Sequence, residues 1–179
     1  MRKLIKIYWI LLLVSAVVII LDQITKSIVR ANLPFGVSYT PIEAIPFFRF
    51  VHWENTGAAF GMFQGGGTVF AILAVIVTII IIVYYPQIPQ QYLFMRIAVA
   101  MQMGGAIGNL LDRIRFGPVL DFIAVGVFPV FNIADASITV GVAILLISLW
   151  VEERKQKETP HLSENDTQDS FESLLDDKP

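Results

Sequence analysis

The stretch TVFAILAVIVTIIIIVYY, from Thr68 to Tyr85, decides the fold class of this chain. It contains no charged side chain, and its length is close to the roughly 20 apolar residues that an α-helix needs to cross a bilayer. A helix that is apolar on every side is buried, either in the core of a large protein or in a membrane. A chain of 179 residues has no such large core. The stretch therefore predicts a membrane-spanning helix.

Three further apolar runs have a similar length, at residues 5–21, 92–111 and 130–150. Hydrophobic residues make up 55% of the chain and charged residues 16%, with a mean hydropathy of +0.67, which is typical of membrane proteins. The first run could instead be a signal peptide, but it continues past Ser15 and Ala16 without a clean cleavage site. We therefore expect one membrane domain, residues 1–150, built as an all-α bundle of four transmembrane helices.

Composition also excludes several kinds of chemistry. The chain has no cysteine, which excludes disulfides, thiolate catalysis and cysteine metal sites. Its two histidines, His52 and His161, are too far apart in the sequence for a zinc site. The sequence has no basic patch with interleaved aromatic residues, so nucleic acid is not an expected partner. We expect neither a metal nor a cofactor.

Basic residues at the two ends of the chain predict the direction of the spans. They are Arg2, Lys3 and Lys6 at the first span, and Arg154, Lys155 and Lys157 after the fourth. The positive-inside rule then puts both termini in the cytoplasm and the loops at residues 22–67 and 112–130 outside. The connection at residues 86–91 has no basic residue and adds no support. The cytoplasmic tail is residues 151–179, and its acidic part, residues 158–179, is predicted to be disordered.

The first outer loop is too long to be only a connector. Residues 46–60 show a weak alternation of side chains that favours a strand, followed by glycines at turn positions. We expect a small β-sheet at the outer membrane–water boundary, a depth that suits Trp53.

Carboxylates are rare in the apolar part of the chain, which holds six acidic residues before residue 151. Asp121 lies in the apolar run VLDFI, and Asp135 lies in FNIAD at the start of the fourth span. A charged side chain at the centre of a membrane helix costs about 2.5–3.5 kcal/mol on an insertion scale. Two carboxylates in such surroundings therefore need a specific role.

The predicted topology brings the unusual polar residues of separate segments to one depth, near the outer leaflet. They are Asp22, Lys26, Asn55, Asn109, Asp112, Arg113, Asp121, Asn132 and Asp135. In the inner halves of the spans we expect Arg96 to extend to the cytoplasmic headgroups.

Most of these residues also have a structural interpretation. Asp22 and Lys26 are four apart and could form an ion pair on one helix face, and Asn109 and Arg113 have the same spacing. Asn132 and Asp135 have the spacing of a capping box. The small residues Gly104, Gly105 and Gly108 are typical of close helix packing. Asp121 has no such explanation, because no cation is near it in the sequence.

Five segments together resemble lipoprotein signal peptidase, the type II signal peptidase of bacteria. They are DQITK from Asp22, NTGAAF from Asn55, GGAIGNLLDR from Gly104, VLDFI from Val119 and FNIAD from Phe131. Each is weak alone, but they occur in the family's order over about residues 5–150. Gly61 follows NTGAAF where the family often has serine.

The resemblance implies a four-helix membrane bundle with an outer β-cradle and a short periplasmic helix, in the inner or plasma membrane of a bacterium. It implies an aspartic endopeptidase that cleaves diacylglyceryl-modified prolipoproteins before the lipidated cysteine, with Asp121 and Asp135 as the catalytic dyad. Substrate-binding or supporting roles fall on Asp22, Lys26, Asn55, Gly105, Asn109, Asp112, Arg113 and Asn132. The partners implied are lipidated precursors, membrane lipid and the inhibitor globomycin, and we expect a monomer.

Two carboxylates that share one proton can activate a water and then protonate the leaving amine. Apparent pKa values belong to such a pair, so which aspartate is charged at rest stays open. Three other classes also fit intramembrane polar residues. They are a proton-coupled transporter, a non-catalytic assembly subunit, and a Ser–Lys protease that uses Ser27 or Ser137.

Overall fold

The computed structural model describes residues 2–57 and 62–158. The elements are α1 (Arg2–Asn32), β1 (Ser38–Tyr39), β2 (Phe48–Asn55), α2 (Gly67–Tyr84), the 3-10 helix η2 (Tyr85–Gln87), α3 (Leu93–Arg115), β3 (Val119–Val125) and α4 (Ile133–Glu158). The structure forms two units, residues 1–146 and 147–179, and α4 runs from the first into the second. The tail predicted to be disordered lies, from residue 159, outside the described residues.

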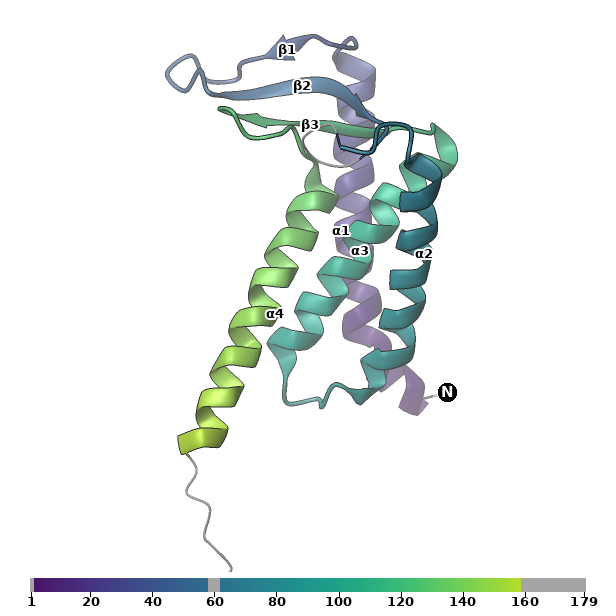
Figure 1. The fold of residues 1–179 in the computed structure, drawn as a ribbon, viewed down its shortest axis with the longest axis vertical. Coiled ribbons are helices and arrows are strands. Elements are labelled where there is room, and N and C mark those ends of the chain that lie inside the picture. The colour runs from purple at the N-terminus through teal and green to yellow at the C-terminus, as the bar shows by residue number, and fades with distance from the viewer. Residues whose placement is uncertain (1, 58–61, 159–179) are drawn as a thin grey trace, which may run out of the picture. The chain divides into compact units, whose positions relative to one another are not determined.

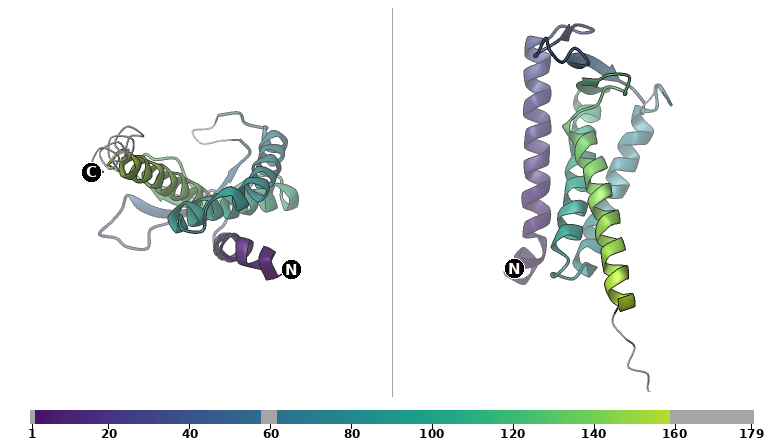
Figure 2. Two further views of the ribbon diagram at one scale, coloured as in Figure 1. Left: turned by 90° about the horizontal axis from the view of Figure 1, so that it is seen from below. Right: turned by 90° about the vertical axis from the view of Figure 1, so that its left-hand side faces the viewer.

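The prediction of four membrane-spanning helices is confirmed. Four helical segments are long and apolar enough to cross a membrane, at Lys6–Asn32, Gly67–Gln87, Leu93–Arg115 and Ile133–Lys155. In the first unit, a three-stranded sheet lies across one end of α1, α2 and α3, next to the start of α4 (Figures 1 and 2). The connection between α2 and α3 lies at the opposite end (Figure 1).

Proline and glycine explain where these helices end. Pro86 lies two residues after the end of α2, in the short helix η2, at a position where its missing N–H is tolerated. At the end of α3, Gly117 has a φ of 89°, and its N–H donates to the carbonyl of Arg113 at 3.2 Å. A left-handed residue at this position is the common way to close a helix, and Pro118 prevents its continuation.

Two predicted boundaries are wrong on the outer side. Asp22 was expected to open the outer loop at residues 22–67, but α1 continues for ten more residues, to Asn32. Asp112 was expected in the loop at residues 112–130, but it lies inside α3. In both cases polar residues that suggested a loop are buried in ion pairs on a helix. The described residues of the two outer connections form strands and turns and no short helix, and residues 58–61 are not described.

The predicted outer sheet is confirmed, with antiparallel strands in the order β1–β2–β3. Trp53 pairs with Asp121 and Asn55 pairs with Val119, and the register shifts between Phe50 and Trp53. Residues two apart on a strand share a face, so this register puts Asn55 and Asp121 on one face of the sheet.

Helix α3 contacts its neighbours through glycines, as the sequence predicts. A Cβ atom at Gly104 would lie 2.8 Å from Cβ of Val18 on α1. A Cβ atom at Gly105 would overlap the carbonyl oxygen of Ala134 and lie 2.7 Å from Cγ1 of Ile138 on α4. The absent side chains therefore let the helix backbones approach closely.

The prediction that Arg96 extends to the headgroups is wrong. Its side chain is only 2% exposed. Its Nη1 donates to the carbonyl of Ile88 at 3.0 Å, its Nη2 donates to the carbonyl of Ile7, and its Cζ lies 4.5 Å from the ring centroid of Tyr85. These carbonyls and the aromatic face replace water, so the guanidinium stays inside the protein.

We predict that Gly105→Ala destabilises the protein by about 1–3 kcal/mol, the usual effect of overpacking. The new methyl group would meet a backbone carbonyl, which cannot move aside as a flexible side chain can. Thermal unfolding in detergent micelles measures the change. Gly67→Ala is the matched control, since its Cβ would have no neighbour nearer than 3.7 Å. Equal melting temperatures for both variants would contradict the packing argument.

Candidate active site

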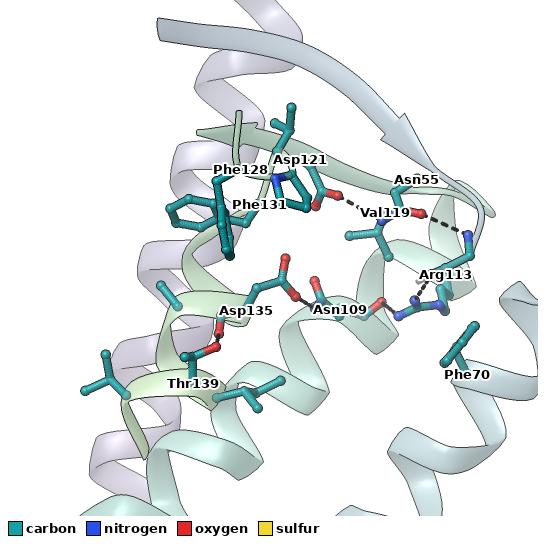
Figure 3. Close-up of a pocket in the computed structure, with 16 residues that line it drawn as sticks. Asn55, Phe70, Asn109, Arg113, Val119, Asp121, Phe128, Phe131, Asp135 and Thr139 are labelled. Atoms are coloured by element: carbon teal, nitrogen blue, oxygen red, sulfur yellow. Dashed lines mark hydrogen bonds between the residues drawn. The ribbon is translucent and has the colours of Figure 1, made fainter. Parts of the chain in front are cut away.

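A cavity of about 560 Å³ lies below the sheet, between α2, α3 and the first turns of α4. Both aspartates singled out in the sequence line it, together with Asn55, Asn109 and Arg113. Figure 3 shows Asp121 reaching into the cavity from β3 and Asp135 from α4. The rest of the lining is mainly apolar and includes Phe70, Phe128, Phe131 and Ile138.

Asp121 is 1% exposed and lies in the sheet next to Asn55. The Asn55 Nδ2 donates to Asp121 Oδ2 at 3.0 Å, and the Asn132 Nδ2 donates to Asp121 Oδ1 at 2.7 Å. Both carboxyl oxygens therefore accept a hydrogen bond, which offsets the free-energy cost of burying this group. Neither partner is near Asp121 in the sequence, which is why no local pattern explained this residue.

Asp135 forms the capping box that its spacing predicts. The Asn132 N–H donates to Asp135 Oδ2 at 3.2 Å, and the Asp135 N–H donates to Asn132 Oδ1 at 2.9 Å. The Asn109 Nδ2 also donates to Asp135 Oδ1 at 2.7 Å. Capping and lining the cavity are therefore compatible, and Asn132 contacts both aspartates.

Behind Asn109 lies a fully buried cluster of charges. The Lys26 Nζ is 2.8 Å from Asp22 Oδ2 and 3.1 Å from Asp112 Oδ2, and it donates to Asn109 Oδ1 at 3.0 Å. Lys26, Asp22 and Asp112 are each 0% exposed. Arg30 adds a second cation, 3.2 Å from Asp112 Oδ2, so that the two carboxylates face two cations.

The two carboxylates of this cluster also hold backbone segments around the cavity. Asp22 Oδ1 accepts from the N–H of Ala134 at 3.1 Å, which connects α1 to the first turn of α4. Asp112 Oδ2 accepts from the N–H of Leu120 at 3.1 Å, next to Asp121. The cluster therefore supports the two segments that carry the aspartates.

Arg113 forms one wall of the cavity. Its guanidinium donates to the carbonyls of Asn109 at 3.3 Å and of Gly57 at 3.5 Å, and its Cζ lies 5.4 Å from the ring centroid of Phe70. Its positive charge lies at the wall of the cavity, where it could bind a carbonyl or carboxylate group of a ligand.

Burial and, to a smaller extent, the nearby Asp135 carboxyl raise the pKa of Asp121 from its ordinary 3.8 to about 7. The hydrogen bonds from Asn55 and Asn132 and the charge of Lys26 oppose this rise. Asp121 therefore exchanges a proton near neutral pH, as a group in acid–base catalysis must.

The structure divides the predicted site residues into two layers. Those that line the cavity are Asp121, Asp135, Asn55, Asn109 and Arg113. Those that lie behind it are Asp22, Lys26, Asp112, Asn132 and Gly105, and the first four are 0% exposed. The second layer does not line the cavity.

Sequence reasoning missed several members of the site. Gln23 donates to Asp22 Oδ2 at 3.1 Å and to Asp112 Oδ1 at 3.3 Å, and Arg30 pairs with Asp112. Arg30 could have been found, because it continues the four-residue spacing of Asp22 and Lys26. Phe70 and Phe128 gave no signal, since apolar residues in apolar segments do not stand out.

The fold and the cavity define an integral membrane protein with two aspartates that line one cavity. Residues 14–151 match the family model described as Signal peptidase (SPase) II. The "Lipoprotein signal peptidase" proteins of Staphylococcus aureus strains JH9 and Newman are 38% identical over 152 residues, covering 82% of this chain and 91% of each relative.

Two solved structures, both described as bacterial membrane enzymes determined by the in meso method, share the fold. The one at 2.3 Å resolution has a TM-score of 0.76 and 34% identity, covering 86% of this chain and 94% of the other. The one at 1.9 Å has a TM-score of 0.70 and 37% identity, covering 78% and 91%. The chain belongs to the signal peptidase II family, and it is therefore a peptidase and a multi-pass membrane protein.

The raised pKa of Asp121 predicts a pH-dependent stability. Because the folded state holds this proton more tightly than the unfolded state, the contribution of Asp121 to the free energy of unfolding falls as pH rises from about 4 to about 7. Above about 7 this contribution is constant. Melting temperatures of the wild type and Asp121→Asn, compared between pH 4 and 8, should diverge only in that window. Parallel curves would contradict a raised pKa.

Proposed function

We propose that this protein is an aspartic endopeptidase that removes the signal peptide from diacylglyceryl-modified lipoprotein precursors, cleaving just before the lipidated cysteine. Family membership supports the substrate class, since the relatives are called lipoprotein signal peptidases. The observation that carries the chemistry is the meeting of Asp121 and Asp135 at one apolar cavity, each held by amide donors.

In this mechanism the aspartate pair holds one proton at neutral pH. The ionised carboxyl takes a proton from a water between the pair, and the water attacks the scissile carbonyl. The protonated carboxyl donates to the carbonyl oxygen as negative charge develops there. The proton taken from water then moves to the leaving amine. Each carboxyl accepts two hydrogen bonds from amide groups, so neither role is reserved for one aspartate.

The walls of the cavity suit an extended peptide that carries a lipid. Arg113 and Asn55 provide donors, with Phe70 beside Arg113, and Phe131 and Ile138 provide further apolar surface. The lining continues along α4 to Thr139 and Val140, and Val140 is 48% exposed. In this proposal the acyl chains remain in the bilayer beside α4, and the substrate arrives by lateral diffusion.

The orientation of the chain follows from the basic residues at its two ends. We propose that both termini are cytoplasmic and that the sheet and the cavity lie near the outer leaflet. The sheet and the turn before β2 expose aromatic side chains, including Tyr39, Phe47 and Trp53, which is typical of the membrane–water boundary. The protein would act as a monomer, and globomycin would compete with the precursor for the cavity.

The contacts of the two serines argue against a Ser–Lys protease. The Ser27 hydroxyl donates to the carbonyl of Gln23 at 2.7 Å, and the Ser137 hydroxyl donates to the carbonyl of Ile133 at 2.8 Å. The Lys26 ammonium is held instead by Asp22, Asp112 and Asn109. Neither serine is activated by this lysine in the described structure.

We predict that Asp121→Asn and Asp135→Asn each reduce cleavage of a lipidated precursor by at least about 100-fold, the lower range for a positioned acid or base. Purified protein in lipid-containing micelles, a synthetic diacylated precursor and mass spectrometry of the products provide the measurement. Glu54→Gln is the matched control, because it removes an exposed carboxylate from the same sheet.

Each variant must keep the melting behaviour of a folded protein for the comparison to count. Near-normal turnover by either folded aspartate variant would contradict the dyad. Loss of turnover in Ser27→Ala or Ser137→Ala, with both aspartate variants active, would favour the Ser–Lys alternative.

A further inference from the structure

The three asparagines beside the aspartate pair share a geometric feature. Each has its amide oxygen held by a group that can only donate, so that its amide nitrogen is turned toward a carboxylate. The oxygen of Asn55 accepts from the N–H of Gly57 at 2.9 Å, and the oxygen of Asn132 accepts from the N–H of Asp135 at 2.9 Å. In both cases a backbone N–H fixes the orientation of the amide.

Asn109 differs from the other two asparagines, because its oxygen is held by a side chain. The donor is the Lys26 ammonium, at 3.0 Å, and Asn132 Nδ2 donates to the same oxygen at 3.1 Å. An ammonium has three donors and no acceptor, so the Asn109 atom facing Lys26 must be the oxygen. The Asn109 nitrogen therefore faces Asp135 Oδ1, at 2.7 Å.

Lys26 itself has little freedom to move. It is 0% exposed, it does not line the cavity, and Asp22 and Asp112 hold its Nζ at 2.8 and 3.1 Å. The charged groups around it are Asp22 and Arg30 on α1, Asp112 and Arg113 on α3, Asp121 on β3, and Asp135 on α4. Its charge also acts on the aspartate pair through the low-dielectric interior.

We propose that Lys26 is a positioning residue for the aspartate pair, and that it acts by fixing the orientation of the Asn109 amide. Without Lys26, the Asn109 amide can flip and present its oxygen to Asp135, which replaces an attractive contact with a repulsive one. Asn132 Nδ2 donates both to the Asn109 oxygen and to Asp121, so a flip of the Asn109 amide would also disturb the hydrogen bond to Asp121. This inference rests on the proposed function of the pair, but it also predicts a change that does not require turnover.

The test must separate an effect of Lys26 on the aspartate pair from a loss of stability in the charge cluster. Lys26→Met alone leaves Asp22 and Asp112 short of a cation, which threatens folding. The double variant Asp22→Asn/Lys26→Met removes an opposite pair, and Asp22→Asn alone is its reference. Lys6→Met is the matched control, because it removes an exposed lysine from the same helix, α1, twenty residues before Lys26.

Relative to Asp22→Asn, the double variant should lose about tenfold or more in kcat, the effect of losing one charge-assisted hydrogen bond. KM should stay within about twofold, since Lys26 does not reach the cavity. The alkaline limb of the pH–rate profile should move to higher pH. Lys6→Met should keep the kcat and the pH–rate profile of the wild type.

The second readout is the ¹³Cγ chemical shift of Asp121, followed by NMR against pH in detergent micelles. Its midpoint should rise in the double variant relative to Asp22→Asn, because an attractive cation is lost. A folded double variant with unchanged kcat and unchanged midpoint would overturn the role of Lys26. If the wild type fails to cleave the precursor, the proposed function fails, while the NMR titration still judges the role of Lys26.

Discussion

The buried ion pair between Lys26 and Asp22, completed by Asp112, is the constraint on which the site depends. These groups are 0% exposed, and removing one partner of such a cluster typically costs about 3–5 kcal/mol. The cluster joins α1 to α3, and Asp22 also holds the first turn of α4 through the N–H of Ala134. The same cluster therefore neutralises the charges inside the bundle and positions the segments that form the site.

The aspartate pair follows from that arrangement in two steps. Asp112 holds the N–H of Leu120, and the register of β2 with β3 brings Asn55 to Asp121. Close packing at Gly105 then lets α4 bring Asp135 to the same cavity. Two carboxylates become tolerable in apolar surroundings because amides from three segments donate to them. The same donors leave the pKa of Asp121 near 7, where a carboxyl group can give and take a proton.

Features that depend on composition and local spacing could be predicted from the sequence. The span at residues 68–85 agrees closely with α2, and the span at residues 92–111 agrees with the start of α3, because apolar length is a strong signal. The capping box of Asn132 and Asp135 was also predictable from spacing alone. The likeness of five motifs to one family pointed to Asp121 and Asp135, and both line the cavity.

Features that depend on distant contacts could not be predicted in this way. The end of α1 was placed too early, because a charged residue such as Asp22 suggests the end of a membrane span. Its buried partner Lys26, which keeps it inside the helix bundle, is known only from the structure. Arg96 was expected at the headgroups, but carbonyls of Ile7 and Ile88 bind it inside the protein. The donors to Asp121 come from residues 66 and 11 positions away, so only the folded register reveals them.

The central claim is that Asp121 and Asp135 act together on one scissile bond. A crystal structure with a diacylated peptide that carries a hydroxymethylene group in place of the scissile amide tests this most directly, because such a group mimics the tetrahedral intermediate. If both aspartates act on the bond, the hydroxyl lies within about 3 Å of a carboxyl oxygen of each aspartate. A ligand whose hydroxyl contacts only one aspartate, or lies outside the cavity, would contradict it.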